Sequence, residues 1–256
     1  MNRIDKKFEE LRKAGRKGLI GYLTAGDPDV GISEKNIRTA IENGLDILEL
    51  GVPFSDPTAD GPTIQEAAQR SLSAGMNLGG VLQIVKNLRK DFDLPIVLFG
   101  YVNPFFKYGY EEICADAAKA GVDGMLVVDL PFEQADELRT HMDKHNLSLI
   151  PLIAPTTPME RSVMILKNSS GFVYYIMVTG VTGARNDVAS DIAGHVNELR
   201  ECTQLPIAVG FGVSNGTQAR QAGKSADAVV VGSALVKAAG GGNLGSLVSE
   251  LSKALG

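Results

Sequence analysis

Eight short runs of β-type residues recur along this chain, and segments of helical pattern separate them. The runs are LIGYL (19–23), DILEL (46–50), PIVLFGY (95–101), GMLVVDL (124–130), LSLIPLI (147–153), FVYYIMV (172–178), PIAVGF (206–211) and AVVVG (228–232). Most are apolar on both faces, as parallel strands are when helices cover them. Strands that alternate with helices indicate parallel βαβ units. Eight such units in 256 residues predict one closed (β/α)8 barrel domain over residues 1–256.

Two internal similarities favour a barrel over two unrelated domains. NGLDILEL (43–50), AGVDGMLVV (120–128) and AGKSADAVVV (222–231) each show a Gly, then an Asp, then a strand. LRKDFDLPIVLFG (88–100) resembles LRECTQLPIAVGFG (199–212), which places the third expected strand over the seventh, half a barrel later. An open doubly wound sheet is the structural alternative. The dinucleotide-binding form of that fold carries a GxGxxG motif after its first strand, and this sequence has none there.

The segment before the first run predicts an extra N-terminal helix, because Ile4, Phe8 and Leu11 have helical spacing. Its sequence MNRIDKKFEELRKAGRKG is too polar for a signal peptide, and no apolar run reaches the roughly 18 residues of a membrane span. Cys114 and Cys202 lack CxxC spacing and are expected as free thiols in a reducing compartment. We therefore expect a cytoplasmic protein without a membrane partner.

The charge balance restricts the partners further. A formal net charge of −5 and a pI near 5.3 argue against binding to nucleic acid or to an anionic membrane. A local pocket for a small anion remains compatible with this charge. His141, His145 and His195 fall on expected helices or helix ends without metal-ligand spacing, and no GxSxG motif is present. Neither a metal site nor a nucleophilic triad is expected.

Catalytic residues of a (β/α)8 barrel lie at the C-terminal ends of its strands, and Glu49 holds such a position. Strand alternation puts Leu48 and Leu50 under the helices and turns Ile47 and Glu49 toward the barrel axis. Burial raises the pKa of an inward carboxylate, which suits a general acid or base that works near neutrality. The alternative is a structural Glu bound to backbone amides or to an interior Lys, yet the expected strand cores contain no Lys or Arg.

The loop after this strand, GVPFSDPTADGPT, carries two further carboxylates. Asp60 precedes a Gly and Asp56 precedes a Pro, and both patterns are also ordinary turn chemistry. A catalytic role and a turn role therefore stay open for both residues. Pro53, Pro57 and Pro62 stiffen the loop, and a long ordered loop in a compact domain is usually functional.

Glycine-rich segments follow the last three expected strands. They are TGVTGAR (179–185), GFGVS (210–214) and VGSALVK (231–237). Glycines after strands seven and eight, with Ser233 at the start of a short helix, are typical of the barrel phosphate site. Backbone amides of Gly212, Gly232 and Ser233 can bind a phosphate without a basic side chain, whereas plain turns are the alternative. The first segment could close as a lid, with Gly180 and Gly183 as hinges.

Other polar and aromatic residues are expected at the barrel mouth. These are Tyr22, Tyr101, Asn103, Asp129 and Tyr174. Aromatic side chains from several strands could enclose a flat apolar ligand. Taken singly, a residue of this kind is more often part of the ordinary core than of a binding site.

The segment ELGVPFSDPTADGPTIQ (49–65) closely resembles the signature of the tryptophan synthase alpha subunit family. Further segments match the same family in the same order, so the resemblance covers nearly the whole chain; they are YLTAGDP (22–28), GVDGMLVVDLP (121–131), GVTGAR (180–185) and GFGVS (210–214). The resemblance implies a (β/α)8 barrel that cleaves indole-3-glycerol phosphate into indole and glyceraldehyde 3-phosphate by a retro-aldol reaction.

The resemblance also implies roles for individual residues. Glu49 would protonate C3 of the indole and take the proton of the glycerol hydroxyl, and Asp60 would bind the indole N–H. Tyr174 matches an active-site tyrosine, and Tyr22 stands where many members carry Phe. Tyr101 is expected to contact the substrate. The phosphate binders would be Gly183, Gly212, Gly232 and Ser233.

A partner subunit is implied in the same way. Pro53 and Asp56, together with Asn103 and Pro104, match the face that docks a beta subunit containing pyridoxal phosphate. The resemblance predicts an alpha2beta2 assembly in which indole passes internally and is joined to serine. It predicts no cofactor in this chain.

Several alternatives remain at this stage. The nearest enzyme alternatives are two phosphate-binding barrels of the same pathway, indole-glycerol-phosphate synthase and phosphoribosylanthranilate isomerase. The synthase requires a Lys at a strand end, and the expected strand cores contain none. A non-catalytic barrel that only binds or activates a partner belongs to a different class, and the presence of Glu49 and Asp60 argues against it. A stand-alone lyase that releases free indole is the third possibility.

Overall fold

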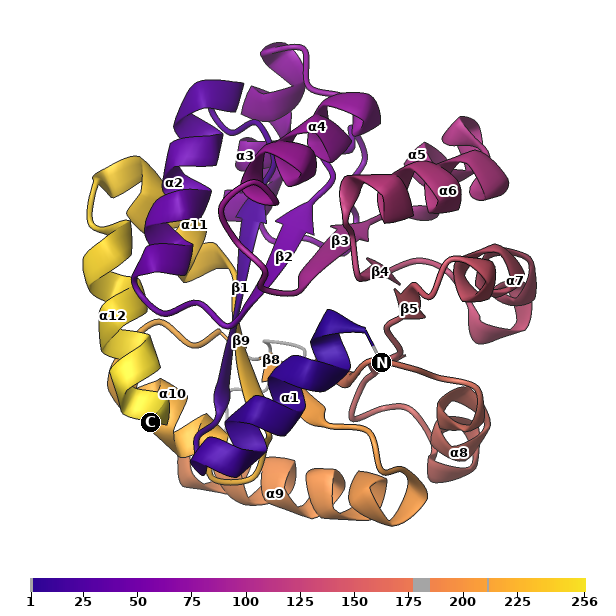
Figure 1. Ribbon diagram of the computed structural model, residues 1–256. Helices are drawn as coiled ribbons and strands as arrows, with labels where there is room; N and C mark the ends of the chain where they lie inside the picture. Colours follow the sequence, from indigo (N-terminus) through magenta and orange to yellow (C-terminus); the bar gives the residue numbers. More distant parts are fainter. Residues whose placement is uncertain (1, 177–184, 211) are drawn as a thin grey trace.

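The computed structural model describes residues 2–176, 185–210 and 212–256. Its strands are β1 (Gly18–Thr24), β2 (Ile47–Gly51), β3 (Ile96–Gly100), β4 (Gly124–Val127), β5 (Ser148–Leu149), β6 (Leu152–Ile153), β7 (Val173–Ile176), β8 (Ile207–Gly210) and β9 (Ala228–Val231). Each strand pairs in parallel with its neighbours, in the order β5-β4-β3-β2-β1-β9-β8-β7-β6. The helices form a ring around this sheet (Figure 1).

The helices alternate with the strands along the chain. They are α1 (Arg3–Ala14), α2 (Val30–Glu42), α3 (Pro62–Ser73), α4 (Leu78–Leu88), α5 (Val102–Tyr108), α6 (Tyr110–Ala120), η1 (Phe132–Gln134), α7 (Asp136–Lys144), α8 (Met159–Lys167), α9 (Arg185–Cys202), α10 (Gly216–Gly223), α11 (Ser233–Gly241) and α12 (Leu244–Leu255). The predicted fold class is therefore confirmed. Within the described ranges, no helix is long and apolar enough to cross a membrane.

The fifth expected strand, 147–153, differs from the prediction because it divides into β5 and β6. The two parts are joined by Ile150 and Pro151, and Pro151 has no N–H to donate to a ladder. The first part pairs with β4 and the second with β7, and the Tyr174 N–H donates to the carbonyl of Pro151 at 2.9 Å. Since β5 and β6 are consecutive in the chain, this segment joins the two ends of the sheet and closes the barrel.

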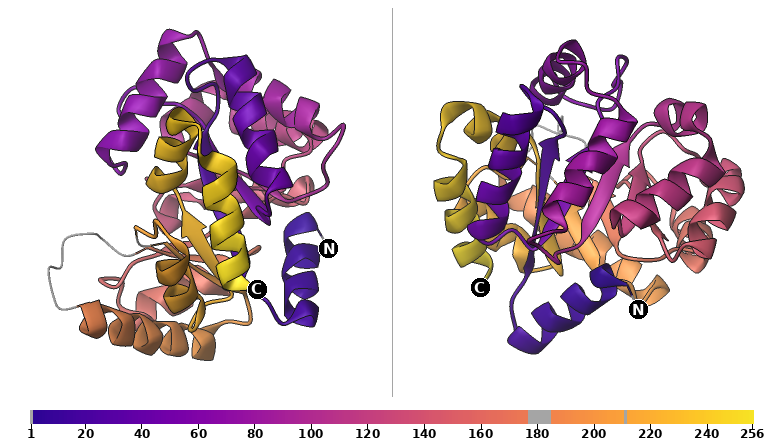
Figure 2. Two further views of the ribbon diagram at one scale, coloured as in Figure 1. Left: turned by 90° about the vertical axis from the view of Figure 1, so that its left-hand side faces the viewer. Right: turned by 45° about the horizontal axis from the view of Figure 1, so that its top comes forward.

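Helix α1 covers the N-terminal end of the barrel (Figures 1 and 2). Its buried residues Ile4, Phe8 and Leu11 belong to the same apolar cluster as the inward side chains of the strands. The rings of Phe8 and Phe172 lie 5.8 Å apart, centre to centre. Because this end is occupied by α1, the opposite end, where the strands finish, is left for a binding site.

The internal repeat found in the sequence has a structural cause at the N-terminal ends of three strands. Asp46, Asp123 and Asp227 each precede a strand. Each carboxylate accepts a hydrogen bond, at 2.9 Å in all three cases, from a backbone N–H of the paired strand that comes earlier in the chain. The donor is the first or second residue of that strand. The N–H of each Asp donates back to the carbonyl of that same residue, at 2.8–3.0 Å. The repeated Asp thus fixes the register between neighbouring strands.

An arginine completes the arrangement in the two halves of the barrel. Arg89 contacts Asp123 at 2.8 Å and the carbonyl of Gly121 at 2.9 Å. Arg200 contacts Asp227 at 3.0 Å and the carbonyl of Ser225 at 3.2 Å. These two arginines occupy equivalent places in the similar segments 88–100 and 199–212, so the half-barrel repeat is a repeat of structural anchors.

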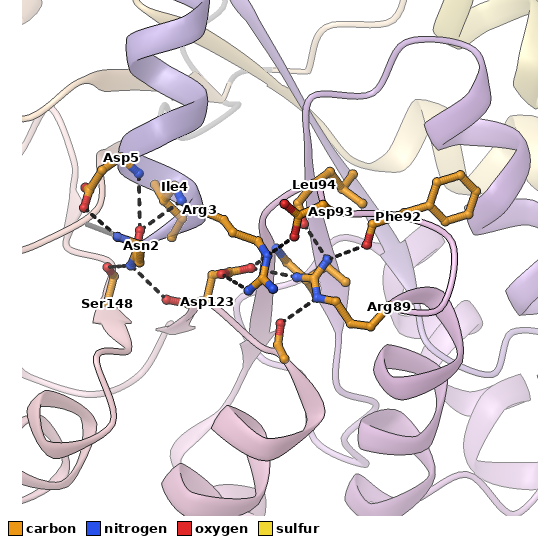
Figure 3. A network of polar contacts seen from close by, with 12 residues as sticks. Asn2, Arg3, Ile4, Asp5, Arg89, Phe92, Asp93, Leu94, Asp123 and Ser148 are labelled. Carbon is orange, nitrogen blue, oxygen red and sulfur yellow. Dashed lines mark hydrogen bonds and ion pairs between the residues drawn. The ribbon is translucent and has the colours of Figure 1, made fainter.

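The anchor at Asp123 also holds the N-terminal segment (Figure 3). Arg3 donates to Asp123 at 3.1 Å and pairs with Asp93 as well. Asn2 caps α1 through the backbone N–H groups of its first turn and donates to Ser148 Oγ at 2.8 Å. Contacts between residues more than 100 positions apart therefore hold α1 against the barrel.

Candidate active site at the barrel mouth

Glu49 lies inside the barrel, near the C-terminal end of β2, as the strand alternation predicted. Leu48 and Leu50 pack in the outer apolar layer, and Ile47 packs in the inner one. Glu49 is 0% exposed and aligns with Tyr22 on β1 and Val97 on β3. The apolar pattern of the strand thus places one carboxylate in the apolar interior of the barrel.

Neither carboxylate oxygen of Glu49 has a hydrogen-bond partner within the described part of the chain. Burial alone raises the pKa of Glu49 to about 8. The charged form is disfavoured because no cation or N–H compensates for the lost water. At neutral pH the resting side chain is therefore the protonated acid, which is the form that donates a proton.

Tyr22 packs beside Glu49, and the position of its ring requires a glycine at residue 51. A Cβ at Gly51 would lie 2.5 Å from Cζ of Tyr22 and even closer to its hydroxyl oxygen. The hydroxyl oxygen of Tyr22 accepts a hydrogen bond from Thr24 at 3.3 Å, and its ring meets Phe99 edge-on at 5.1 Å. The Tyr22 ring therefore occupies the space that any larger residue at position 51 would need.

Asp60 reaches the same region from the loop between β2 and α3. Its N–H donates to the carbonyl of Pro57 at 3.1 Å, so the predicted turn exists. Its carboxylate also accepts a hydrogen bond from the hydroxyl of Tyr101 at 3.0 Å. Burial raises the pKa of Asp60, and the bond from Tyr101 opposes that rise. Asp60 thus forms the predicted turn and also directs a partly buried carboxylate toward Tyr101.

Three tyrosines share the electrostatic environment of these two acids. The pKa of Tyr22 and that of Tyr174 are raised first by burial and further by the charges of Asp60 and Glu49. The pKa of Tyr101 is raised by burial and then by Asp60. The structure therefore brings together Glu49, Asp60 and the three tyrosines that the sequence indicated separately.

A cavity of about 700 Å³ lies at the ends of β7, β8 and β9. Among its lining residues are Tyr174, Gly212, Gly232 and Ser233. Gly232 is the N-cap of α11 and no side chain caps this helix in the described chain, so its first N–H groups are available to an anion. Gly212 has a φ of 59°, a conformation that favours glycine. Gly183, the fourth expected phosphate binder, lies outside the described residues.

The residues expected at a partner interface lie around the loop and α5. Asp56 and Asn103 are exposed, Pro104 is half-buried, and Pro53 is buried within this chain. Phe106 beside them is 63% exposed, although the sequence reasoning did not select it.

Asp129 and His195, which the sequence left without a role, have hydrogen-bond partners in the fold. The carboxylate of Asp129 accepts a hydrogen bond from the N–H of Val102 at 2.8 Å and so holds the start of α5. His195 Nδ1 lies 3.0 Å from the Tyr175 hydroxyl, on the outer side of the sheet. Across the described ranges, no group of three or more His, Cys, Asp or Glu side chains could hold a metal ion.

Several residues of the cavity lining were not among the predicted site residues. Ile64 and Lys237 line the 700 Å³ cavity. Helical spacing could have indicated Lys237, because it lies four residues after Ser233 and hence on the same face of α11.

Comparison with known proteins agrees with this geometry. The family model described as tryptophan synthase alpha chain matches residues 8–249. The tryptophan synthase alpha chain of Geobacter sp. (strain M21) is 51% identical over 93% of this chain and 89% of its own. That of Geobacter sulfurreducens is 47% identical over 100% of both chains.

Solved structures give the same result. The tryptophan synthase alpha chain of Legionella pneumophila subsp. pneumophila has a TM-score of 0.91 and 35% identity, over 100% of this chain and 97% of that one. A ligand-free tryptophan synthase structure from M. tuberculosis has a TM-score of 0.92 and 33% identity, over 100% and 99% of the two chains. This chain therefore belongs to the tryptophan synthase alpha chain family, an enzyme family of tryptophan biosynthesis.

Proposed function

We propose that this chain cleaves indole-3-glycerol phosphate to indole and glyceraldehyde 3-phosphate, with Glu49 as the general acid and base. Family membership supports the reaction. The observation that carries the assignment of roles is the pairing of a fully buried Glu49, whose pKa is about 8, with an Asp60 held by Tyr101. Two carboxylates in different environments can take different roles at one pH.

Glu49 can serve both proton transfers in turn. Its protonated form first donates to C3 of the indole ring, which turns the indole into a leaving group. The resulting carboxylate then takes the proton of the glycerol hydroxyl as the carbon–carbon bond breaks and the aldehyde forms. Glu49 ends protonated, as it began, so no other acid or base is needed.

Asp60 carries the complementary role. Protonation at C3 leaves a positive indolenine, whose ring N–H gains acidity and charge. An ionised Asp60 beside that N–H stabilises this intermediate. The hydrogen bond from Tyr101 favours the ionised form of Asp60 and fixes its orientation.

The remaining predicted residues bind the two ends of the substrate. In this proposal Tyr22 and Tyr174 enclose the indole, while Tyr101 acts through Asp60. The phosphate lies on the backbone amides of Gly212, Gly232 and Ser233, together with Gly183. The helix N-terminus at Ser233 favours an anion without any side chain.

A beta subunit completes the proposed function. Asp56, Asn103 and Pro104 supply a partly exposed docking face, and the buried Pro53 sets the shape of the loop beneath it. The exposed Phe106 adds apolar surface to this face. We propose an alpha2beta2 assembly in the cytoplasm, in which pyridoxal phosphate belongs to the beta subunit and this chain works without a cofactor.

A cleavage assay tests the proposal. Purified chain is incubated with indole-3-glycerol phosphate, with and without a beta subunit, and indole is quantified. We expect indole from the wild type and more of it when the beta subunit is present. Glu49→Gln should lower turnover about a thousandfold and Asp60→Asn severely, with circular dichroism spectra unchanged. Indole from neither mixture would defeat the enzyme assignment, and retained turnover in Glu49→Gln would defeat the role of Glu49.

A further inference from the structure

Lys237 is the one charged side chain among the described residues that line the 700 Å³ cavity. It lies on α11, four residues after Ser233, so both side chains project from one face of that helix. The same cavity is lined by Gly212 and Gly232, which belong to the proposed phosphate cradle. A single cation therefore stands at the anion-binding end of the site.

The surroundings of Lys237 leave its ammonium group available. Helix α11, SALVKAAGG, contains no Asp or Glu, and neither do the other described residues of the cavity lining. Among the ion pairs found in the described ranges, none includes Lys237. Its side chain is exposed. An exposed lysine at the edge of a cavity, with no ion pair to any described residue, is suited to contact an anion there.

The charge of the whole chain makes this cation more significant. With a net charge of −5, the protein repels a phosphate dianion at long range. The charges of Glu49 and Asp60 act on Tyr174 in the cavity lining, so these acids add to the repulsion when they are ionised. Backbone amides supply directional hydrogen bonds but only partial charge. A full positive charge beside the cradle offsets the repulsion where the phosphate enters.

We propose that Lys237 is a binding and specificity residue for the phosphate end of the substrate. It supplies the countercharge that the amides of Gly212, Gly232 and Ser233 lack, and it discriminates phosphorylated from unphosphorylated substrates. This inference rests on the proposed function of the same site. Lys237 contacts the phosphate end and not the reacting carbon, so it stabilises the bound substrate and the transition state equally. Its loss is therefore expected to change KM rather than kcat.

The test compares Lys237→Gln and Lys237→Arg with the wild type. Lys253→Gln is the matched control, because Lys253 is an exposed lysine on the neighbouring helix α12 outside the cavity lining. We expect Lys237→Gln to raise KM for indole-3-glycerol phosphate about three- to fivefold, with kcat changed less than about twofold. Lys237→Arg should restore KM to within about twofold, since it keeps the charge. Lys253→Gln should behave as the wild type.

Two further measurements separate this proposal from others. Dephosphorylated indole-3-glycerol should be turned over equally by the wild type and Lys237→Gln, and the Kd of glycerol 3-phosphate should depend less on salt in the variant. Equal KM effects on both substrates, or equal effects of Lys237→Gln and Lys253→Gln, would overturn the proposal. If the wild type cleaves no substrate, the proposed function fails, but the glycerol 3-phosphate titration still decides whether Lys237 binds phosphate.

Discussion

The hydroxyl of Tyr101 donates a hydrogen bond to Asp60 Oδ2 at 3.0 Å and accepts another from the N–H of Ala59 at 3.0 Å. Tyr101 follows β3 and is the N-cap of α5, whereas Asp60 lies in the loop after β2. The ring of Tyr101 also packs on Phe54, centre to centre at 5.4 Å. One side chain therefore holds both ends of the loop between β2 and α3, and its hydrogen bond opposes the rise that burial causes in the pKa of Asp60.

Replacing Tyr101 by Phe should lower kcat/KM at least about tenfold, because a hydrogen bond to a charged group contributes about 1.5–3 kcal/mol. The ring contact with Phe54 stays, so the fold should persist. Without this bond the pKa of Asp60 rises further, and the acidic limb of the pH–rate profile should move to higher pH. Tyr108→Phe is the control, because its hydroxyl bonds Asp116 at 2.9 Å on the outer helices. An unchanged rate in Tyr101→Phe would remove Tyr101 from the site.

Glu49 predicts a pH dependence of stability. Its pKa is about 8 in the folded chain and near 4.5 when unfolded. Between these values the unfolded state releases a proton that the folded state keeps, so the free energy of unfolding falls as pH rises through this window. The contribution of Glu49 to the free energy of unfolding is fully present below about pH 4.5 and is lost above about pH 8.

Urea unfolding of the wild type and Glu49→Gln at several pH values between 5 and 8 measures this effect. The neutral Gln cannot titrate, so the difference between the two proteins isolates the contribution of Glu49. We expect the stability of the variant relative to the wild type to increase by at least about 1 kcal/mol from pH 5 to pH 8. A constant difference would show that Glu49 titrates near its ordinary pKa, and the acid role at neutral pH would then be lost.

The sequence predicted those parts of the site that depend on local periodicity. Glu49 was placed inside the barrel because alternation in DILEL leaves no other face for Leu48 and Leu50. Asp60 could not be resolved from turn chemistry, because its deciding partner, Tyr101, lies 41 residues away. The interruption of the fifth strand at Pro151 was equally hidden, since the run LSLIPLI is apolar throughout and only pairing shows where it changes neighbour.

The internal repeat also shows that contacts between strands cannot be deduced from local sequence. The shared Asp of three segments was visible as a pattern, but its hydrogen bond to the preceding strand depends on sheet register. Lys237 was missed for a different reason. It lies in the segment VGSALVK, but the sequence does not show that the cavity extends along the next turn of α11.

Gly51→Ala should damage the site through Tyr22. The new Cβ would lie 2.5 Å from Tyr22 Cζ, which is too close for any real contact, so the ring must move. Overpacking of this kind costs about 1–3 kcal/mol of stability, and kcat/KM should fall because Tyr22 borders Glu49. Gly194→Ala in α9 is the control, since nothing lies within 4 Å of the added methyl group. Thermal unfolding and the cleavage assay check both effects, and a fully active Gly51→Ala would contradict the proposed place of Tyr22 in the indole pocket.

Asp123→Asn should lower stability without changing the chemistry. Asp123 is 3% exposed, and its carboxylate holds Arg89, Arg3 and the N–H of Ile96 at the closed, N-terminal end of the barrel. Removing one partner of a buried ion pair costs about 3 kcal/mol or more, because the arginine is left uncompensated. Asp93→Asn removes a carboxylate that also pairs with Arg3 but is 85% exposed, so it should cost less than about 1 kcal/mol. Urea unfolding gives the two free energies, and kcat/KM measured well below the unfolding transition should match the wild type in both variants. A large loss of kcat/KM in folded Asp123→Asn would contradict this prediction and would mean that the anchor at the N-terminal end is coupled to the mouth through the strands.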